Sequence, residues 1–258
     1  MTDLLELQAD CSRCVGLCCV ALALSKSADF AIDKSPGEPC PNLQSDFRCG
    51  IHAELRERGF RGCAVYDCFG AGQHVVQGTF GGRSDPRMWD VFGVMRQLHE
   101  LLWLLREALA LPTSRPLQAQ LQRAFDDTRR LTESPPDAVL QVDVAACRER
   151  TNAVLRRASE LARATVLGRD YAGADLLGAR LRDLRGANLR GAVLIGANLQ
   201  NADLRLADVT GADFRDADLR GADLSTTLFL SQQQLAAARG DGHTRLPTAL
   251  GPPFHWPA

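Results

Sequence analysis

The sequence lacks an excess of either charge, a long apolar run and a basic leader. It contains 30 Lys and Arg residues and 31 Asp and Glu residues, so its formal net charge is −1. A dedicated nucleic-acid binder carries a basic patch or domain, and this balance argues against that class. No apolar run approaches the roughly 20 residues that a membrane-spanning helix needs. The first ten residues hold no Lys or Arg, unlike a secretory signal. We therefore expect a cytoplasmic protein without a membrane partner.

The sequence motifs that are typical of common enzyme classes are also missing. We find no Ser-His-Asp motif, and "FGAGQH" at residues 69–74 contains glycines without the spacing of a phosphate-binding loop. We therefore assign no catalytic residue and no cofactor-binding residue, and we expect a protein without enzymatic activity.

Cysteine and glycine are each absent from long stretches, and these gaps divide the chain into zones. After Cys68 only Cys147 remains, and no glycine lies between Gly93 and Gly168. A lone cysteine such as Cys147 is usually a small buried hydrophobe. The expected division is a cysteine-rich metal-binding domain at 1–82, a helical segment at 83–163, a five-residue repeat at 164–229 and a capping tail at 230–258.

Apolar residues at spacings of three and four predict three helices in the second zone. The first should start at Pro86 with Asp85 as its N-cap and end before Pro112. The second is expected over residues 116–131 and the third over residues 137–163.

The third zone repeats with a period of five residues, which fits neither an α-helix nor a flat strand. Each unit has a small Ala, followed two positions later by a large apolar residue. We expect each unit to form one side of a square coil, with Leu and Ala inside and Gly at the corners. The alanines lie at 174, 179, 187, 192, 197, 202, 207, 212, 217 and 222, and the large residues are Leu176, Leu181, Leu189, Leu194, Leu199, Leu204, Val209, Phe214, Leu219 and Leu224.

This repeat resembles the pentapeptide-repeat family, whose pattern is A(D/N)LXX. The resemblance implies a mixed fold: a right-handed quadrilateral β-helix, preceded here by the helical segment and the cysteine-rich domain. The leucines of "GARLRDLRGANL" break the period, which predicts an irregular corner near residues 182–185. Some members of the family bind gyrase by mimicking DNA. Residues 164–229 hold eight Arg and nine Asp, so they lack the strongly acidic field of such a mimic, and this function is a minor alternative.

The tail is expected to cover the last apolar coil, as solenoids require. Leu228, Leu230 and Leu235 should do so, followed by an extended strand that contains Leu246, Phe254 and Trp256.

Eight of the nine cysteines lie within residues 11–68, beginning with "CSRCVGLCC". Thiolate is a ligand that zinc and iron prefer, and a structural zinc ion takes four ligands. In a reducing compartment such a cluster is more often a metal or redox site than a set of disulfides. We expect the eight thiols to hold two ions, with zinc preferred over iron, although they could instead serve one cluster with some thiols left over. His52 and His74 could replace one of them. The expected ligands are Cys11, Cys14, Cys18, Cys19, Cys40, Cys49, Cys63 and Cys68.

The segments "CSRCVGLCC" and "GEPCPNLQSDFRCGIH", together with Cys63 and Cys68, resemble the YkgJ-like cysteine-cluster family, which is described as zinc- or iron-chelating. This chain has "RERGFRGC" where many members have Arg-Pro. The order of cysteine cluster, helices and pentapeptide repeat looks like that of proteins common in actinobacteria. The resemblance implies metal ligands but no reaction.

Two functions fit these features. The first is a non-catalytic metal-binding protein whose repeat offers a rigid surface to an unidentified protein partner. The second is an iron- or copper-dependent enzyme, or a redox sensor, in which the metal keeps an open coordination position. We favour the first, because the chain carries no recognisable catalytic motif.

Overall fold

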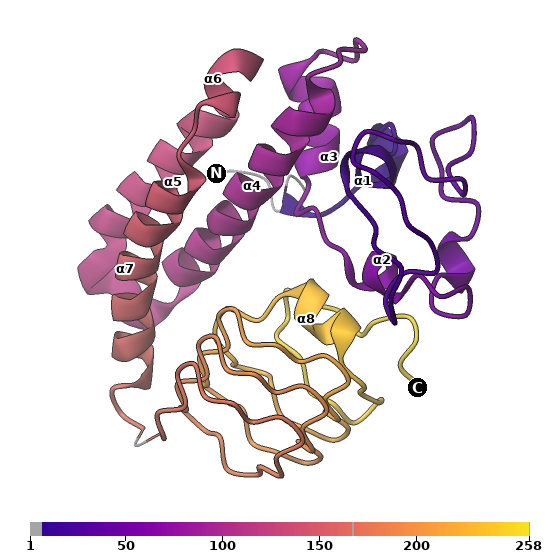
Figure 1. The fold of residues 1–258 in the computed structure, drawn as a ribbon. Helices are drawn as coiled ribbons and strands as arrows, with labels where there is room; N and C mark the ends of the chain where they lie inside the picture. Colours follow the sequence, from indigo (N-terminus) through magenta and orange to yellow (C-terminus); the bar gives the residue numbers. More distant parts are fainter. Residues whose placement is uncertain (1–6, 167, 258) are drawn as a thin grey trace. The chain divides into compact units, whose positions relative to one another are not determined.

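The computed structural model describes residues 7–166 and 168–257, which divide into two compact units (Figure 1). The first unit comprises Met1–Leu109 and Gln118–Leu155, and the second comprises Ala110–Leu117 and Arg156–Ala258. The start of the chain, where we expected no secretory signal, lies partly outside the described residues. No helix in the described ranges is long and apolar enough to cross a membrane.

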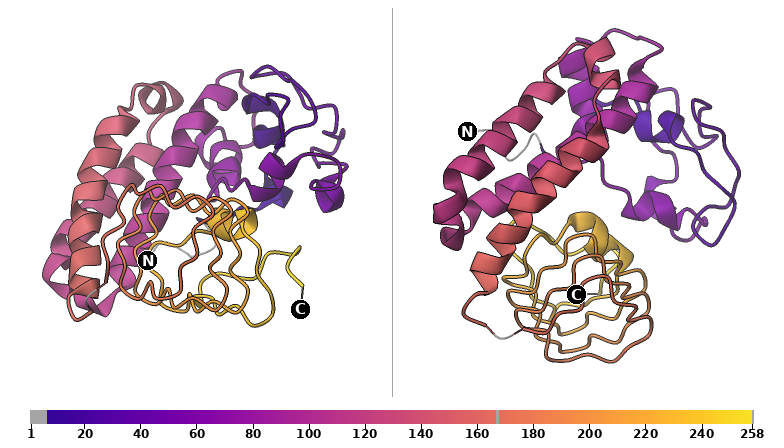
Figure 2. Two further views of the ribbon diagram at one scale, coloured as in Figure 1. Left: turned by 60° about the horizontal axis from the view of Figure 1, so that its bottom comes forward. Right: turned by 60° about the vertical axis from the view of Figure 1, so that its left-hand side comes forward.

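Three long helices run side by side in both figures of the whole chain (Figures 1 and 2): α4 (Met88–Ala110), α5 (Gln118–Thr132) and α7 (Val144–Arg163). The apolar face predicted for the first helix is buried, with Phe92, Met95 and Leu98 at most 1% exposed. The third predicted helix is interrupted. Its first part is the short α6 (Pro136–Leu140), and Asp143 then starts α7 by accepting a hydrogen bond from the Ala146 N–H at 2.9 Å.

The cysteine-rich segment consists of short helical turns joined by loops. Two isolated antiparallel bridges, Leu24↔Lys34 and Leu43↔Cys49, tie these loops together. The helical turns are η2 (Cys11–Arg13), α1 (Leu17–Ala21), η3 (His52–Glu54), α2 (Arg61–Val65), α3 (Ala71–Gln73) and the π-helix η4 (His74–Thr79).

The expected right-handed quadrilateral β-helix is not formed. Along the described part of the repeat no strand is present, and successive turns of the chain are joined by isolated parallel bridges of one residue each. The cause lies in the period itself. Two residues of each unit are in a turn, and the corner before each Ala takes a left-handed φ, as at Gly191 (φ 64°) and Gly196 (φ 63°). Pairing therefore cannot extend beyond one residue. We call residues 169–229 the repeat stack.

The irregular corner predicted near residues 182–185 is present, as a shortening of the chain. Bridges before it join residues 18 apart, as in Arg180↔Asn198, whereas Asp183↔Asp203 and the next five join residues 20 apart. The unit between Arg180 and Asp183 is thus two residues shorter than its neighbours. The chain follows a tighter path through its first turn than through the later ones.

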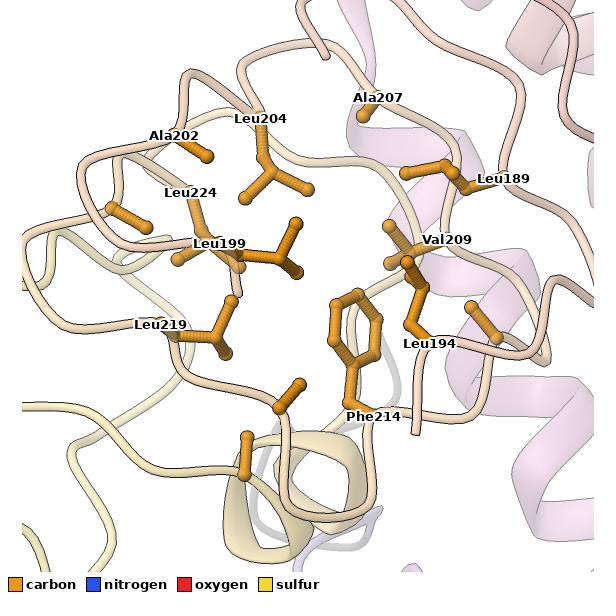
Figure 3. Packing of buried hydrophobic residues seen from close by; sticks show 14 of the residues in the cluster. Leu189, Leu194, Leu199, Ala202, Leu204, Ala207, Val209, Phe214, Leu219 and Leu224 are labelled. Carbon is orange, nitrogen blue, oxygen red and sulfur yellow. The ribbon is translucent and has the colours of Figure 1, made fainter. Parts of the chain in front are cut away.

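The inward orientation of the Leu and Ala positions is confirmed. Figure 3 shows the large side chains and the alanine methyl groups pointing into a common interior. Leu189, Leu194, Leu199 and Leu204 are 0% exposed. The first turn is less well covered, because Leu176 and Leu181 are only partly buried. The interior of the repeat stack is therefore almost entirely aliphatic, with one aromatic ring at Phe214.

The tail continues the stack and closes it. Leu228, Leu230 and Leu235 are at most 4% exposed, as predicted. A short helix that we did not expect, α8 (Gln232–Ala237), starts at a capping box formed by Ser231 and Gln234. The Trp256 indole donates to the Ala238 carbonyl at 3.1 Å, so it seals the end. The extended strand predicted to follow the three leucines is wrong, because residues 246–256 form turns and irregular loops, and Phe254 is 69% exposed.

One ion pair of the repeat stack is buried, and it supports a prediction. Asp208 is 0% exposed and pairs with the Arg190 guanidinium at 3.0 Å. Replacing Arg190 with Ala leaves a buried carboxylate without its cation, so we expect Arg190→Ala to lower the free energy of unfolding by about 3 kcal/mol or more. The matched variant Arg215→Ala breaks the exposed pair with Asp213 and should cost about 0–1 kcal/mol. Urea denaturation of both variants gives the comparison, and equal losses would contradict a structural role for the buried pair.

Candidate metal centre

All eight cysteines of the N-terminal segment line a single cavity of about 580 Å³. They come from loops and short helices that are far apart in the sequence. None of them is in a disulfide. The structure thus brings the whole predicted ligand set to one place, although its metal content stays a prediction. The cavity is lined by Cys11, Cys14, Cys18, Cys19, Cys40, Cys49, Cys63 and Cys68, together with apolar side chains such as Leu24, Phe30 and Phe60.

The first four cysteines are placed by two consecutive turns. Asp10 caps η2 by accepting from the Ser12 N–H at 2.9 Å, which positions Cys11 at the start of that turn and Cys14 at its end. Gly16 then adopts a left-handed φ of 70° and starts α1, which carries Cys18 and Cys19. A side chain at position 16 would also collide with Leu43 at 2.6 Å, so glycine is required there.

The adjacent thiols Cys18 and Cys19 interact directly. The Cys18 thiol hydrogen-bonds to the Cys19 sulfur, which raises the pKa of Cys18 and lowers that of Cys19. Burial also raises the pKa of Cys18, and the positive charge of Lys34 helps to lower that of Cys19. The two thiols therefore share one proton more readily than they both ionise.

Cys40 is held beside Cys19 by a backbone hydrogen bond, and Cys49 and Cys63 lie near both. The Cys40 N–H donates to the Cys19 carbonyl at 2.9 Å, and the Cys40 carbonyl accepts from Leu43, whose own bridge partner is Cys49. Cys63 lies on α2. Burial raises the pKa of Cys63 to about 12, and charges on Cys19, Cys40 and Cys49 raise it further.

The thiols of Cys14 and Cys68 both lie next to Gly72. A Cβ atom at Gly72 would lie 2.9 Å from the Cys14 sulfur and 3.7 Å from the Cys68 sulfur, so only glycine leaves room for both thiols. Burial raises the pKa of Cys68, while the N–H groups of Gly70 and Gly72 hydrogen-bond to its sulfur and lower it. Hydrogen bonds of this kind stabilise a thiolate and are a common outer shell of metal-bound sulfur.

A buried cation accompanies the thiols. Lys34 is 6% exposed, and its ammonium donates to the carbonyls of Val20, Ser35 and Glu38 at 3.0, 3.0 and 2.7 Å. Its charge lowers the pKa of Cys19 and of Cys63. Burying an ammonium is costly without a compensating negative charge, and ionised thiols would supply one.

The thiols of the described residues do not converge as the ligands of one metal ion would. In residues 7–166 and 168–257, no three Cys, His, Asp or Glu side chains are grouped so that they could hold one metal ion. Of the two substitute ligands that we considered, exposed His52 lines the cavity. His74 instead lies on η4 and contacts His99. Cys147 is 6% exposed on α7, as a small hydrophobe would be.

Sequence reasoning missed the buried histidine pair. The His99 ring is hydrogen-bonded through Nδ1 to the Phe69 carbonyl at 2.8 Å and through Nε2 to His74 Nδ1 at 3.0 Å. Trp103, one turn from His99 on α4, contacts the Phe69 ring. The spacing of apolar residues on α4 indicated that position 99 is buried. It could not indicate the partners of His99, because Phe69 and His74 lie 30 and 25 residues earlier in the chain.

This pair predicts a dependence of stability on pH. Burial, and to a lesser degree the charge of His74, lowers the pKa of His99 to about 4 from 6.5. Below pH 6.5 the His99 imidazole binds a proton in the unfolded chain but not in the folded chain. The free energy of unfolding therefore falls between pH 6.5 and about 4. At pH 5 the loss should be about 2 kcal/mol.

The measurement is denaturant unfolding at pH 7 and pH 5 for the wild type and for His99→Phe. The variant should lose about 2 kcal/mol less than the wild type on acidification. The exposed His243, replaced by Gln, should behave like the wild type. Parallel losses in all three proteins would contradict a buried neutral His99.

The repeat stack identifies the class of the protein. Residues 174–211 and 187–225 match the family model for pentapeptide repeats, in eight copies. The chain is a pentapeptide-repeat protein, and along its length it belongs to one family with the uncharacterized protein YybG of Bacillus subtilis (strain 168). The two are 54% identical over 268 residues, covering 97% of this chain and 95% of YybG. Proteins that match this chain along its length therefore occur outside the actinobacteria, and the expectation of an actinobacterial type of protein is not supported.

Solved structures include two similar pentapeptide-repeat proteins, one from the thylakoid lumen of Arabidopsis thaliana and one, Rfr23, from the cyanobacterium Cyanothece 51142. Each is 33% identical to this chain, with a TM-score of 0.24. The matches cover 31% and 30% of this chain and 54% and 56% of those chains. The chain thus spans about half the length of these proteins, and the likeness is too partial to inform its function. The YkgJ-like character of the cysteine segment stays a prediction.

Proposed function

We propose that this protein is a non-catalytic metal-binding protein, which holds zinc or iron through the eight thiols of residues 11–68. The observation that carries the proposal is the single cavity that these thiols line. Eight thiols that come from distant parts of the segment and line one cavity form a ligand set that suits a soft metal. The ninth cysteine, Cys147, lies outside the cavity and serves as an internal contrast.

Two features around the cavity partly offset the burial of the thiols and favour their ionised form, which is the form that binds metal. Backbone N–H groups hydrogen-bond to Cys68, and the ammonium of Lys34 lies near Cys19 and Cys63. A divalent ion with four thiolates carries a net charge of −2, so a buried lysine is a suitable counter-charge. The resemblance to the YkgJ-like family supports the same ligands, and the nine free cysteines fit a reducing compartment such as the cytoplasm.

We further propose that the repeat stack is a surface for a protein partner. Its interior is filled with aliphatic side chains, which makes it rigid. Outside, Arg205, Arg215 and Arg220 each pair with the Asp two residues earlier, at 2.6–2.7 Å. These pairs cancel charge locally, so the surface suits a protein partner better than nucleic acid.

The test of metal binding is elemental analysis of the full chain after anaerobic purification. We expect zinc or iron in stoichiometric amount, with less metal in Cys18→Ser and in Cys19→Ser. The matched variant Cys147→Ser should retain the wild-type content, because Cys147 does not line the cavity. Protein without bound metal, or equal metal content in all four proteins, would remove the proposed function.

A further inference from the structure

We propose that the eight thiols bind a pair of iron–sulfur clusters rather than two isolated ions. The inference rests on the proposed function, because it names the kind of metal group that the same cavity holds. It replaces our preference for zinc, which came from the number and type of the cysteines alone. The volume of the cavity, the spread of the thiols and the outer hydrogen-bond donors carry it.

The cavity is too large for two single ions. Zinc binds thiolate sulfur at about 2.3 Å, so the four sulfurs of a tetrahedral site lie about 3.8 Å apart and enclose little more than the ion. The cavity measures about 580 Å³. The cavity is open to solvent, since the exposed residues Cys11 and His52 line it, and it has room for a group much larger than one ion. A core of four irons and four sulfides is such a group.

The spread of the thiols points in the same direction. All eight line one cavity, yet within the described residues no three potential ligands converge as one ion requires. The thiolates of a cluster bind different irons, so they surround the core without meeting at one point. A cluster needs thiols arranged around a larger space, whereas a single ion needs them to converge on one point.

The contacts divide the thiols into two sets of four. In the first set, the sulfurs of Cys14 and Cys68 both lie against Gly72. In the second, Cys40 is hydrogen-bonded to the backbone of Cys19. The adjacent Cys18 and Cys19, whose thiols hydrogen-bond to each other, lie where the two sets meet and supply one thiol to each. The first set is Cys11, Cys14, Cys18 and Cys68, and the second set is Cys19, Cys40, Cys49 and Cys63. Electrostatic effects agree with the second set, since Cys19, Cys40 and Cys49 all raise the pKa of Cys63, whereas Cys11 is affected by both Cys14 and Cys19.

An unsatisfied hydroxyl group marks the first set. The Tyr66 hydroxyl is buried at the cavity wall and has no hydrogen-bond partner among the described residues. Buried polar groups of this kind are rare in folded proteins and indicate a missing partner. Cluster sulfides and thiolates accept hydrogen bonds, and such bonds tune a cluster's reduction potential. Near Cys68 and Cys18, whose charges affect it, Tyr66 is suited to donate to the first cluster.

The experiment is the composition of the wild-type full chain, expressed with ample iron and purified without oxygen. Iron, acid-labile sulfide and zinc are measured on the same sample, together with the visible absorption and Mössbauer spectra. We expect iron and sulfide in equal amounts and the spectra of iron–sulfur clusters. Cys14→Ser and Cys40→Ser should each lose about half of the iron and sulfide, one set at a time, while Cys147→Ser should lose none.

The outcomes separate this inference from the proposed function. Zinc, or iron without sulfide, overturns the clusters and leaves the metal-binding function in place. Absence of metal after anaerobic purification, and after incubation of the reduced protein with zinc alone or with ferrous iron and sulfide, overturns both. The composition of the wild type decides between these outcomes even if a variant fails to fold.

Discussion

Leu199→Asp is expected to unfold the repeat stack. Leu199 is 0% exposed and points into the interior together with Leu219 and Phe214 (Figure 3). Removing a buried Leu side chain costs about 2–5 kcal/mol by itself. The carboxylate adds the cost of burying a charge, for which the aliphatic interior has no partner. Together these losses approach the 5–15 kcal/mol by which a typical protein is stable.

The matched control is Leu177→Asp, which makes the same substitution within the same stack. Leu177 is 65% exposed, so this variant should lose less than about 0.5 kcal/mol. An exposed Arg would be a poorer control, because Arg205 pairs with Asp203. Thermal unfolding followed by circular dichroism gives the comparison. If Leu199→Asp has the melting temperature of the wild type, the assignment of the leucines to the interior is wrong.

The sequence predicted the interior of the repeat stack better than its hydrogen bonding. A period of five placed Leu and Ala inside and Gly at the corners, because size and backbone freedom are properties of single residues. The number of residues that form β-bridges between successive turns depends on the backbone angles between the corners. Those backbone angles left only isolated bridges and no strand. Non-glycine corners show the same limit: Asn201 and Leu206 adopt left-handed φ values of 54° and 60° where the pattern had suggested glycine.

The sequence predicted which cysteines would line the candidate metal centre, but not the other residues around it. Eight cysteines within residues 11–68 were visible by composition. The Lys34 ammonium and the Tyr66 hydroxyl were not, because each acquires its meaning from residues brought together by the fold. Gly72 is a similar case. In the sequence it is one glycine among 22, and in the structure it is the position where a side chain would displace the Cys14 sulfur.

The first unit has two apolar clusters, which differ in size. Leu17, Val75 and Val76 pack with Phe92 and Met95 of α4 in a large apolar cluster. The loops between α1 and α2 have a much smaller cluster, whose buried members are Leu24, Leu55 and Phe60. At about 25 cal/mol per Å² of buried apolar surface, three side chains cannot offset the entropy of ordering some forty residues. If the proposed metal is bound, it adds the stability that this small cluster lacks.

Removal of metal should therefore unfold the loops of residues 22–66 and leave the repeat stack intact. Structural metal contributes about 10–16 kcal/mol to small thiolate domains, far more than three buried side chains can replace. Hydrogen exchange with and without a strong chelator is the measurement. Amides such as those of Lys34 and Cys40, which are now hydrogen-bonded across the loops, should lose their protection.

The pattern of protection in the rest of the chain provides the control within the same experiment. Amides of α1 and η4 should keep partial protection, since Leu17 and Val75 pack against α4. Amides of the repeat stack, such as Leu199 and Leu204, should exchange as before, because their interior contains no metal ligand. Cys40→Ser should reproduce part of the loss without chelator, and Cys147→Ser should not. Uniform loss along the chain would mean that the two units unfold together, and unchanged exchange in residues 22–66 would mean that their order does not depend on metal.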